Sequence, residues 1–179
     1  VGVVDGGIQP SGSFEGWITV LFGDAIDYAN RRPAKRLLLA PTLVFNPGAR
    51  QELSQGHTLE QLDVQEGNLY KAGNTRLRAN NHFNERTFLR ATLQHVDYRY
   101  NPELYAFEID PEYRRLLSQY LFSYKVNPRT LLYVGYDDDQ LGNHEFGLTR
   151  VNWTVFAKIG YACVMLPPVP DRACALPLG

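Results

Sequence analysis

Apolar and polar residues alternate with a period of two through much of this chain. In the segment 115–126, Tyr120 and Phe122 occupy one set of alternate positions, and Gln119 and Lys125 occupy the other. Successive side chains of a β-strand point to opposite sides of the sheet, so this period predicts a strand with one apolar and one polar face. Almost no segment has the periodicity of a helix.

The same alternation recurs along the chain. In the segment 151–161, Trp153, Val155 and Ile159 alternate with Lys158 and other polar residues. Including less regular segments, the pattern predicts about eight strands, several of them about 9 to 14 residues long. These further segments are 36–46, 69–83, 89–94 and, more weakly, 18–22 and 52–63.

Two kinds of connection alternate between these segments. Short turns are expected at 45–48, 83–87 and 126–130, where an apolar residue is followed by Asn and then by polar turn residues. Asn is a turn former because its side chain bonds its own backbone, and Pro is one because its ring presets φ. The connections between these turns are mostly longer and polar: 25–35, 64–67, 99–112 and 138–150.

Long alternating strands joined by short turns on one side and longer loops on the other are typical of outer-membrane β-barrels. A tilted transmembrane strand needs about 9 to 11 residues, whereas strands of soluble sheets usually have about 5 to 6. The fold class expected is therefore all-β, an antiparallel up-and-down transmembrane barrel.

The alternation also assigns faces, because a strand cannot shift by one residue without exchanging its two sets of side chains. Long cations facing a dry protein core would be costly, so the polar set is expected to face a wet lumen. The residues expected in the lumen are Arg76, Arg78, Arg90, Gln119, Lys125 and Lys158. Those expected to face lipid or form an interfacial aromatic girdle are Trp17, Leu116, Tyr120, Phe122, Trp153, Val155 and Ile159.

Composition narrows the classes of function. The net charge of −1 gives no overall basic excess, and no nucleic-acid partner is expected. The sequence contains no run of about 18 apolar residues, so it predicts no transmembrane helix. The two cysteines, Cys163 and Cys174, fit neither a disulfide framework nor a zinc site; they are either incidental or a single loop-closing disulfide. No cofactor is expected.

The predicted strands occupy residues 1–165. The tail, 166–179, contains four prolines and no alternation, so it is expected to be disordered or loosely packed.

Candidate chemistry is sparse. A loop with Asp137, Asp139, Asn143 and Glu145 is rich in oxygen ligands and is a weak calcium candidate, although its spacing fails the EF-hand pattern and a solvated loop is the plainer interpretation. No histidine pair has metal-ligand spacing. No nucleophile elbow is present, so no catalytic residue is assigned. The four histidines are His57, His82, His95 and His144.

Several motifs together resemble one bacterial family. They are Gly23 to Tyr28 (GDAIDY), Arg86 to Ala91 (RTFLRA), Asp110 to Arg115 (DPEYRR), Gln119 to Thr130 (QYLFSYKVNPRT), Tyr133 to Tyr136 (YVGY) and Phe156 to Ala162 (FAKIGYA). In that family a carbohydrate-binding-like β-sandwich of the family-nine type precedes a large outer-membrane barrel of unknown function. The resemblance spans about residues 10–162, but the family pattern usually has Trp in place of Cys163 and ends soon afterwards.

The resemblance implies an outer-membrane location in a Gram-negative bacterium and implies that these are the last strands of a larger barrel. Their first edge, near 17–24, is then expected to be unpaired. Implied partners are the lipid bilayer, upstream domains of the same protein and, through the sandwich module, carbohydrate. The expected role is a pore, a transport segment or an anchor for that module. A soluble antiparallel barrel that binds a small ligand is the alternative, and a barrel-associated hydrolase is the third interpretation.

Overall fold

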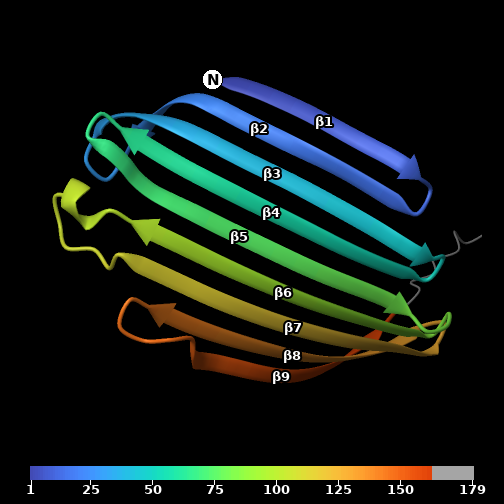
Figure 1. Ribbon diagram of the computed structural model, residues 1–179. Coiled ribbons are helices and arrows are strands. Elements are labelled where there is room, and N and C mark those ends of the chain that lie inside the picture. Colours follow the sequence, from blue (N-terminus) through green and yellow to red (C-terminus); the bar gives the residue numbers. More distant parts are fainter. Residues whose placement is uncertain (163–179) are drawn as a thin grey trace, which may run out of the picture.

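The computed structural model describes residues 1–162 as one β-sheet (Figure 1). Each strand pairs antiparallel with the next in chain order, from β1 to β9. The all-β, antiparallel, up-and-down fold predicted from the sequence is therefore confirmed. The strands are β1 Gly2–Ser11, β2 Phe14–Asp27, β3 Arg32–Gly48, β4 Gln51–Val64, β5 Gly67–His82, β6 Thr87–Tyr100, β7 Glu112–Asn127, β8 Thr130–Asn143 and β9 Thr149–Tyr161.

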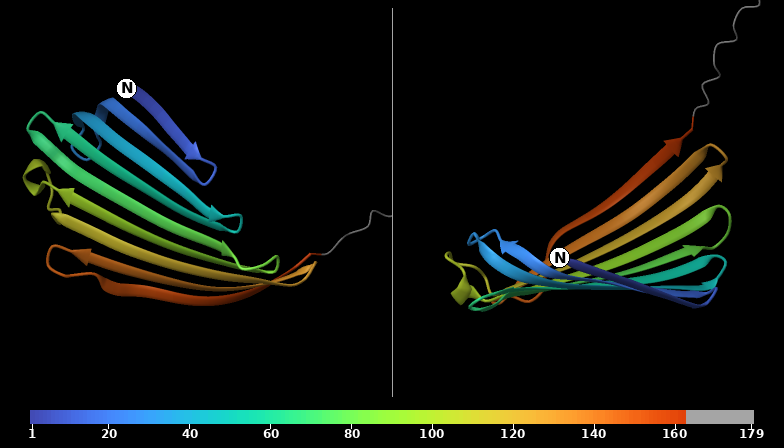
Figure 2. Two further views of the ribbon diagram at one scale, coloured as in Figure 1. Left: turned by 45° about the vertical axis from the view of Figure 1, so that its right-hand side comes forward. Right: turned by 90° about the horizontal axis from the view of Figure 1, so that it is seen from above.

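The sheet is open, with β1 and β9 as its two edges. It is twisted and curved, as the two views of Figure 2 show. Within residues 1–162 no second sheet or α-helix packs on either face; the only helical element there is a single 3-10 turn, η1 (Pro102–Leu104). None of these residues forms a helix of the length and apolarity needed to cross a membrane.

The sequence predicted about eight strands, and the structure has one more at the N-terminal side, β1. None of the alternating segments in the sequence covers β1, because Gly2, Gly6 and Gly7 lower its strand propensity. The open edge expected near 17–24 is consequently wrong: β2 pairs on both sides, and β1 is the edge strand.

At the end of the sheet where long loops were predicted, most of the connections are shorter than the sequence suggested. There β2–β3, β4–β5 and β8–β9 are joined by residues 28–31, 65–66 and 144–148, and only the β6–β7 connection, 101–111, is long. The strands simply continue through polar residues at that end. We call the end with these connections the loop end, and the end of the predicted short turns the turn end.

Two of the three turns predicted at the turn end, 83–87 and 126–130, form as expected, whereas β3 continues through the third, 45–48, and turns at 49–50. The side chains of Asn84 and Asn127 accept hydrogen bonds from the backbone N–H groups of Arg86 and Arg129, at 2.8 and 2.9 Å. Asn143 makes the same kind of turn at the loop end by accepting from Glu145 N–H at 3.1 Å. The expected role of Asn in closing hairpins is thus confirmed for Asn84 and Asn127.

The small buried core lies at the loop end. A β-bulge between β4 and β5 leaves Leu69 without a partner, because Leu62 pairs with Tyr70 and Asp63 pairs with Asn68. A bulge can re-aim a side chain, and Leu69, only 1% exposed, packs in a buried cluster instead of sharing a face with Leu77, as the regular alternation of 69–83 predicted. The other buried members of this cluster are Ala34, Leu62 and Val64.

A glycine and an aromatic ring fit together between β8 and β9. Gly135 pairs with Phe156, and a Cβ atom placed on Gly135 would lie 2.2 Å from the Phe156 ring. The ring therefore covers the space that a side chain on Gly135 would fill, an arrangement that pins strand register. It also explains why Phe156 interrupts the polar set of β9.

The expected tail, 166–179, and the cysteines Cys163 and Cys174 lie outside the residues that the structure describes, as do the last residues of the predicted strand region.

Candidate functional site: the two faces of the sheet

The register defines two faces, because residues directly opposite each other on neighbouring antiparallel strands share a face. One face carries large apolar side chains on all nine strands, and we call it the apolar face. The residues predicted to face lipid lie on it, except Trp17: they are Leu116, Tyr120, Phe122, Trp153, Val155 and Ile159. Others on this face include Val4, Ile18, Phe22, Leu37, Leu43, Phe45, Leu53, Leu59, Leu77, Leu93, Tyr124 and Val134.

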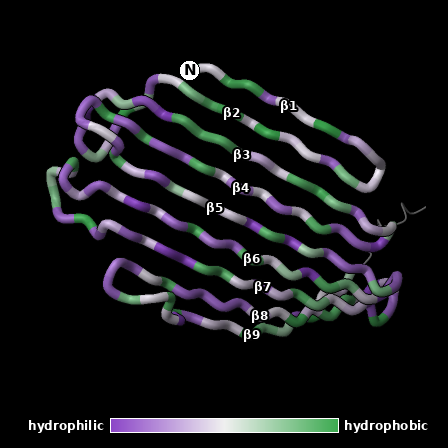
Figure 3. Tube along the Cα trace, viewed as in Figure 1, coloured by the Kyte–Doolittle hydropathy of each residue, from purple (hydrophilic) through white to green (hydrophobic). Residues whose placement is uncertain are grey.

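The apolar face is exposed. Trp153 and Ile159 on the edge strand are 60% and 71% exposed, and Phe122, inside the sheet, is 37% exposed. By contrast, Ser123, which follows Phe122 and points to the opposite side, is only 8% exposed. Soluble proteins rarely expose large continuous apolar surfaces. The alternation behind it is visible along the chain in Figure 3.

Charged residues on the apolar face lie only near the loop end in the described strands. From the turn end through the middle of each strand, this face has no Asp, Glu, Lys or Arg, although His57 and His95 interrupt it on β4 and β6. His57 Nδ1 lies 2.7 Å from the hydroxyl of Thr75 on β5. The charged positions near the loop end are Asp24, Lys35, Asp63, Lys71, Asp97, Arg99, Glu112, Arg114, Asp138 and Arg150.

The opposite side, which we call the polar face, carries every residue that was expected to face a lumen. Arg76 pairs with Gln94, Arg78 with Thr92, and so on across the sheet. The register thus places the expected set together: Arg76, Arg78, Arg90, Gln119, Lys125 and Lys158.

Trp17 is a correction. Its register partner is Thr42, and both lie on the polar face, opposite to Ile18 and Phe22. The sequence placed Trp17 in a girdle because it is aromatic and near a strand end. In β2 both sets of alternate positions hold apolar residues, including Leu21, so the alternation was too weak to fix the side on which Trp17 points.

Two carboxylates on the polar face are paired with arginines of neighbouring strands. The Arg115 guanidinium donates to both carboxylate oxygens of Asp139, at 2.9 and 2.7 Å. The Nε atom of Arg36 lies 3.0 Å from an oxygen of Glu60, which also accepts a hydrogen bond from the hydroxyl of Tyr70 at 2.9 Å. These pairs join neighbouring strands, β7 to β8 and β3 to β4.

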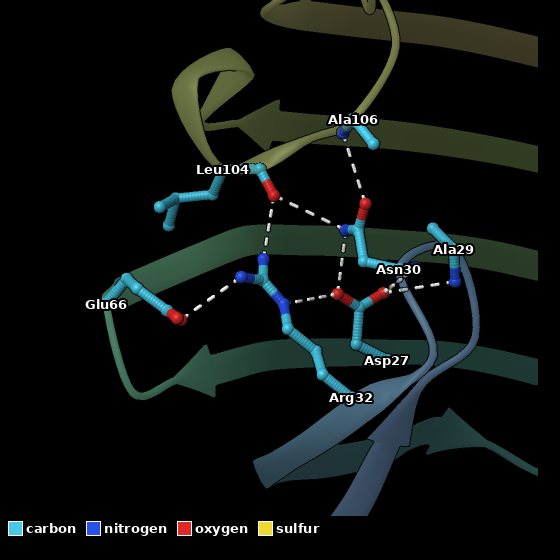
Figure 4. A network of polar contacts seen from close by, with 7 residues as sticks. All are labelled: Asp27, Ala29, Asn30, Arg32, Glu66, Leu104 and Ala106. Atoms are coloured by element: carbon cyan, nitrogen blue, oxygen red, sulfur yellow. Dashed lines mark hydrogen bonds and ion pairs between the residues drawn. The ribbon is translucent and has the colours of Figure 1, made fainter.

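A polar network ties separate connections together at the loop end (Figure 4). The buried carboxylate of Asp27, 2% exposed, accepts hydrogen bonds from Asn30 and Arg32 at 2.8 and 3.0 Å. Arg32 also donates to the carbonyl of Leu104 at 2.7 Å and to Glu66 at 3.1 Å. We call this network the loop latch, because it joins the β2–β3, β4–β5 and β6–β7 connections.

Aromatic side chains extend the loop latch over the polar face. Tyr98 and Tyr100 on β6 stack with ring centroids 5.7 Å apart, and Tyr105 in the β6–β7 connection meets Tyr100 edge-on at 6.0 Å. Burial raises the pKa of Tyr105 to about 12. Neither the loop latch nor this cluster was predicted, because the 101–111 connection brings together residues far apart in sequence.

A hollow of about 660 Å³ opens beside this cluster at the loop end. Its walls are largely apolar and include Tyr100, Tyr113, Ile109, Leu141 and Phe146.

The calcium candidate is not assembled. Asp137 and Asp139 lie within strand β8, not in the loop that was predicted, and Asp139 is bound to Arg115. Asn143 instead accepts hydrogen bonds from the backbone of Glu145 and Phe146. Among residues 1–162 no group of three or more His, Cys, Asp or Glu side chains is placed to hold a metal ion.

A comparison with known protein families, curated proteins and solved structures finds no match. The interpretation of the site therefore rests on the sheet itself.

Proposed function

We propose that this sheet is part of the wall of a bacterial outer-membrane β-barrel, with the apolar face toward lipid and the polar face toward a water-filled lumen. The observation that carries the proposal is the broad apolar face, which no layer covers within residues 1–162. A bilayer supplies an apolar partner, and its core tolerates only structures whose backbone groups are paired internally, as in helices and closed barrels.

The distribution of charge on the apolar face supports the same arrangement. A lipid-facing surface must be free of charge through the hydrocarbon region and can carry charge beyond it. Strands β2 to β9 are 13 to 17 residues long, whereas a tilted strand crosses a bilayer in about 9 to 11. The charged loop end would then extend past the bilayer, while the tight turns lie on the periplasmic side.

The number of strands bears on closure. In a nine-stranded up-and-down sheet, β1 and β9 run in the same direction, so they could pair with each other only as parallel strands. An antiparallel barrel therefore needs an odd number of additional strands between these edges. We propose that the nine strands form one sector of a larger barrel, with a role as a pore, a transport segment or an anchor for an upstream carbohydrate-binding-like module.

The alternative, a soluble barrel that binds a small ligand, requires the opposite orientation of the two faces. A soluble barrel packs its apolar side chains inside and exposes its polar face to water. The side chains of Ser123 and Thr92 on the polar face are 8% and 9% exposed, whereas Phe122 and Leu93 on the apolar face are 37% and 38% exposed. This distribution favours the membrane arrangement.

Neighbouring residues offer a direct test. Val155 and Thr154 are adjacent in β9 and lie on the apolar and polar faces. Each would be replaced by Cys in a chain with Cys163→Ser and Cys174→Ser, labelled with an environment-sensitive fluorophore, and folded into lipid vesicles. We expect spin-labelled lipid to quench the label at Val155→Cys and aqueous iodide to quench the label at Thr154→Cys.

The pair Phe122→Cys and Ser123→Cys repeats the test inside the sheet, away from the edge strand. Equal quenching of both members of a pair by lipid, or failure of the chain to associate with vesicles while remaining a monodisperse monomer without detergent, would refute the proposal.

A further inference from the structure

The polar face carries cations that lack acidic partners. Within residues 1–162, Arg36, Arg115 and Arg32 each lie within ion-pair distance of a carboxylate. In the same part of the chain no such partner is found for the other long cations on this face of β5 to β9. We call these residues the cationic strip: Arg76, Arg78, Arg90, Lys125 and Lys158.

From β5 to β7 the cationic strip runs obliquely toward the turn end, whereas Lys158 on β9 lies back from this line, because its partner Tyr133 is farther from the turn end than Leu131, the partner of Lys125. Arg90 lies closer to the turn end than Thr92, the partner of Arg78, and Lys125 lies closer still than Leu121, the partner of Arg90. Barrel strands tilt by about 35–45° from the barrel axis. An oblique row on the sheet can therefore lie at one depth along the lumen.

The strip borders a hollow on the polar face at the turn end. This hollow has a volume of about 690 Å³, within the range of small-ligand sites. Its lining provides hydrogen-bond donors from Arg50, Arg90, Ser123 and Tyr133, and its only carboxylate is that of Glu52. Lys158 is the register partner of Tyr133 on the same face, so it lies beside this hollow.

Two of the arginines are poised to accept an anion. The Nε atom of Arg90 donates to Asn80 at 3.0 Å, and its guanidinium lies 5.3 Å from the centroid of the Phe88 ring. These contacts hold the guanidinium but leave its charge unneutralised. On the neighbouring strand, the buried Nε atom of Arg78 has no hydrogen-bond partner.

We propose that the cationic strip and its hollow bind small multivalent oxyanions, such as solutes that carry phosphate or sulfonate groups. Arginine recognises such groups through paired N–H donors, and lysine adds a point charge. The location of this site in a lumen rests on the proposed function, but binding itself requires only that the polar face is folded and wet.

The test is a binding measurement in zwitterionic detergent micelles at low salt. The probe is pyranine, a trisulfonated fluorescent dye, followed by fluorescence anisotropy and displaced with inorganic pyrophosphate. Arg90→Gln, Lys125→Gln and Lys158→Gln should each weaken binding by about fivefold, the factor that corresponds to about 1 kcal/mol for a unit charge at contact distance in water. The triple variant should bind still more weakly.

Matched controls are Lys35→Gln and Lys71→Gln, which remove the same charge from the apolar face. They should change affinity by less than about twofold, because water and salt screen distant charges. Circular dichroism and unfolding in urea would establish that each variant remains folded.

Absence of pyranine binding by the unchanged protein, or equal losses for strip and control variants, would overturn this inference. Its outcome is separable from that of the proposed function. If the protein binds the anion but does not enter vesicles, the membrane arrangement is refuted and the anion site stands. If the protein is embedded in lipid but binds no pyranine, the anion site is refuted and the membrane arrangement stands.

Discussion

The turn end and the loop end of the same strands differ sharply. At the turn end the hairpins are closed by tight turns, and the apolar face has no charge. At the loop end both faces carry charges, the β6–β7 connection folds over Tyr100, and the loop latch joins three connections. Alternation alone is continuous along a strand, so it does not reveal where the surroundings change. The charge content of the apolar set does: it divides strands β2 to β9 into an uncharged part, where we propose lipid contact, and a charged part at the loop end.

The largest expected effect comes from placing a charge either in the uncharged part of the apolar face or at its loop end. Phe122→Arg and Val155→Arg put a cation where lipid is proposed, and each should cost about 2–4 kcal/mol of stability, whereas Ile26→Arg, on the same face beside Asp24 at the loop end, should cost about 0–1 kcal/mol. The measurement is urea unfolding in lipid vesicles, with Lys125→Gln and Lys158→Gln as polar-face controls. An equal loss of stability for Ile26→Arg and the two other arginine variants, or a larger loss for the controls, would contradict the division of the apolar face into an uncharged and a charged part.

A second, smaller effect is expected where Gly135 meets Phe156. Gly135→Val forces a side chain into the space held by the ring and should cost about 1–3 kcal/mol. The double variant with Phe156→Ala should recover part of that loss, because the obstacle is gone. A double-mutant cycle by denaturant unfolding measures the coupling; simple additivity would show that the ring does not fix the register of β9.

A third effect, confined to the loop end, is expected from breaking the loop latch. Asp27→Ala leaves Arg32 without its buried partner and should cost about 1–3 kcal/mol, mostly local to the loop end. Hydrogen exchange should become faster in residues 101–111 and stay unchanged in the hairpins of the turn end. Glu108→Ala, in the same connection, is the control. Uniform loss of protection throughout the sheet would mean that the two ends are not energetically separate.

The smallest effect concerns alkaline pH. The pKa of Tyr105 is raised from its ordinary value near 10 to about 12, so the folded state holds this proton more tightly than the unfolded state does. Stability from this group is complete below pH 10 and is lost as the pH rises toward 12. Tyr105→Phe should abolish that part of the decline, as measured by loop protection between these pH values; an unchanged decline would assign it to other groups.

The strands, their faces and the Asn-closed turns were predictable because they depend on neighbouring residues. Phe122 and Lys125 belong to opposite faces by parity alone. Three features were not predictable in this way. The glycines of β1 hide its strand character, the bulge at Leu69 reverses a side chain, and the contacts between Asp27, Arg32 and Leu104 depend on how the 101–111 connection folds.

The odd number of strands also determines sidedness. Strand β1 starts at the loop end and β9 finishes at the turn end, so the polypeptide crosses the sheet once in net terms. In a bilayer, a domain fused directly before β1 and one fused directly after β9 would stand in different compartments, one outside the cell and one in the periplasm. Adding the odd number of strands that antiparallel closure requires would return both ends of the completed chain to the same compartment.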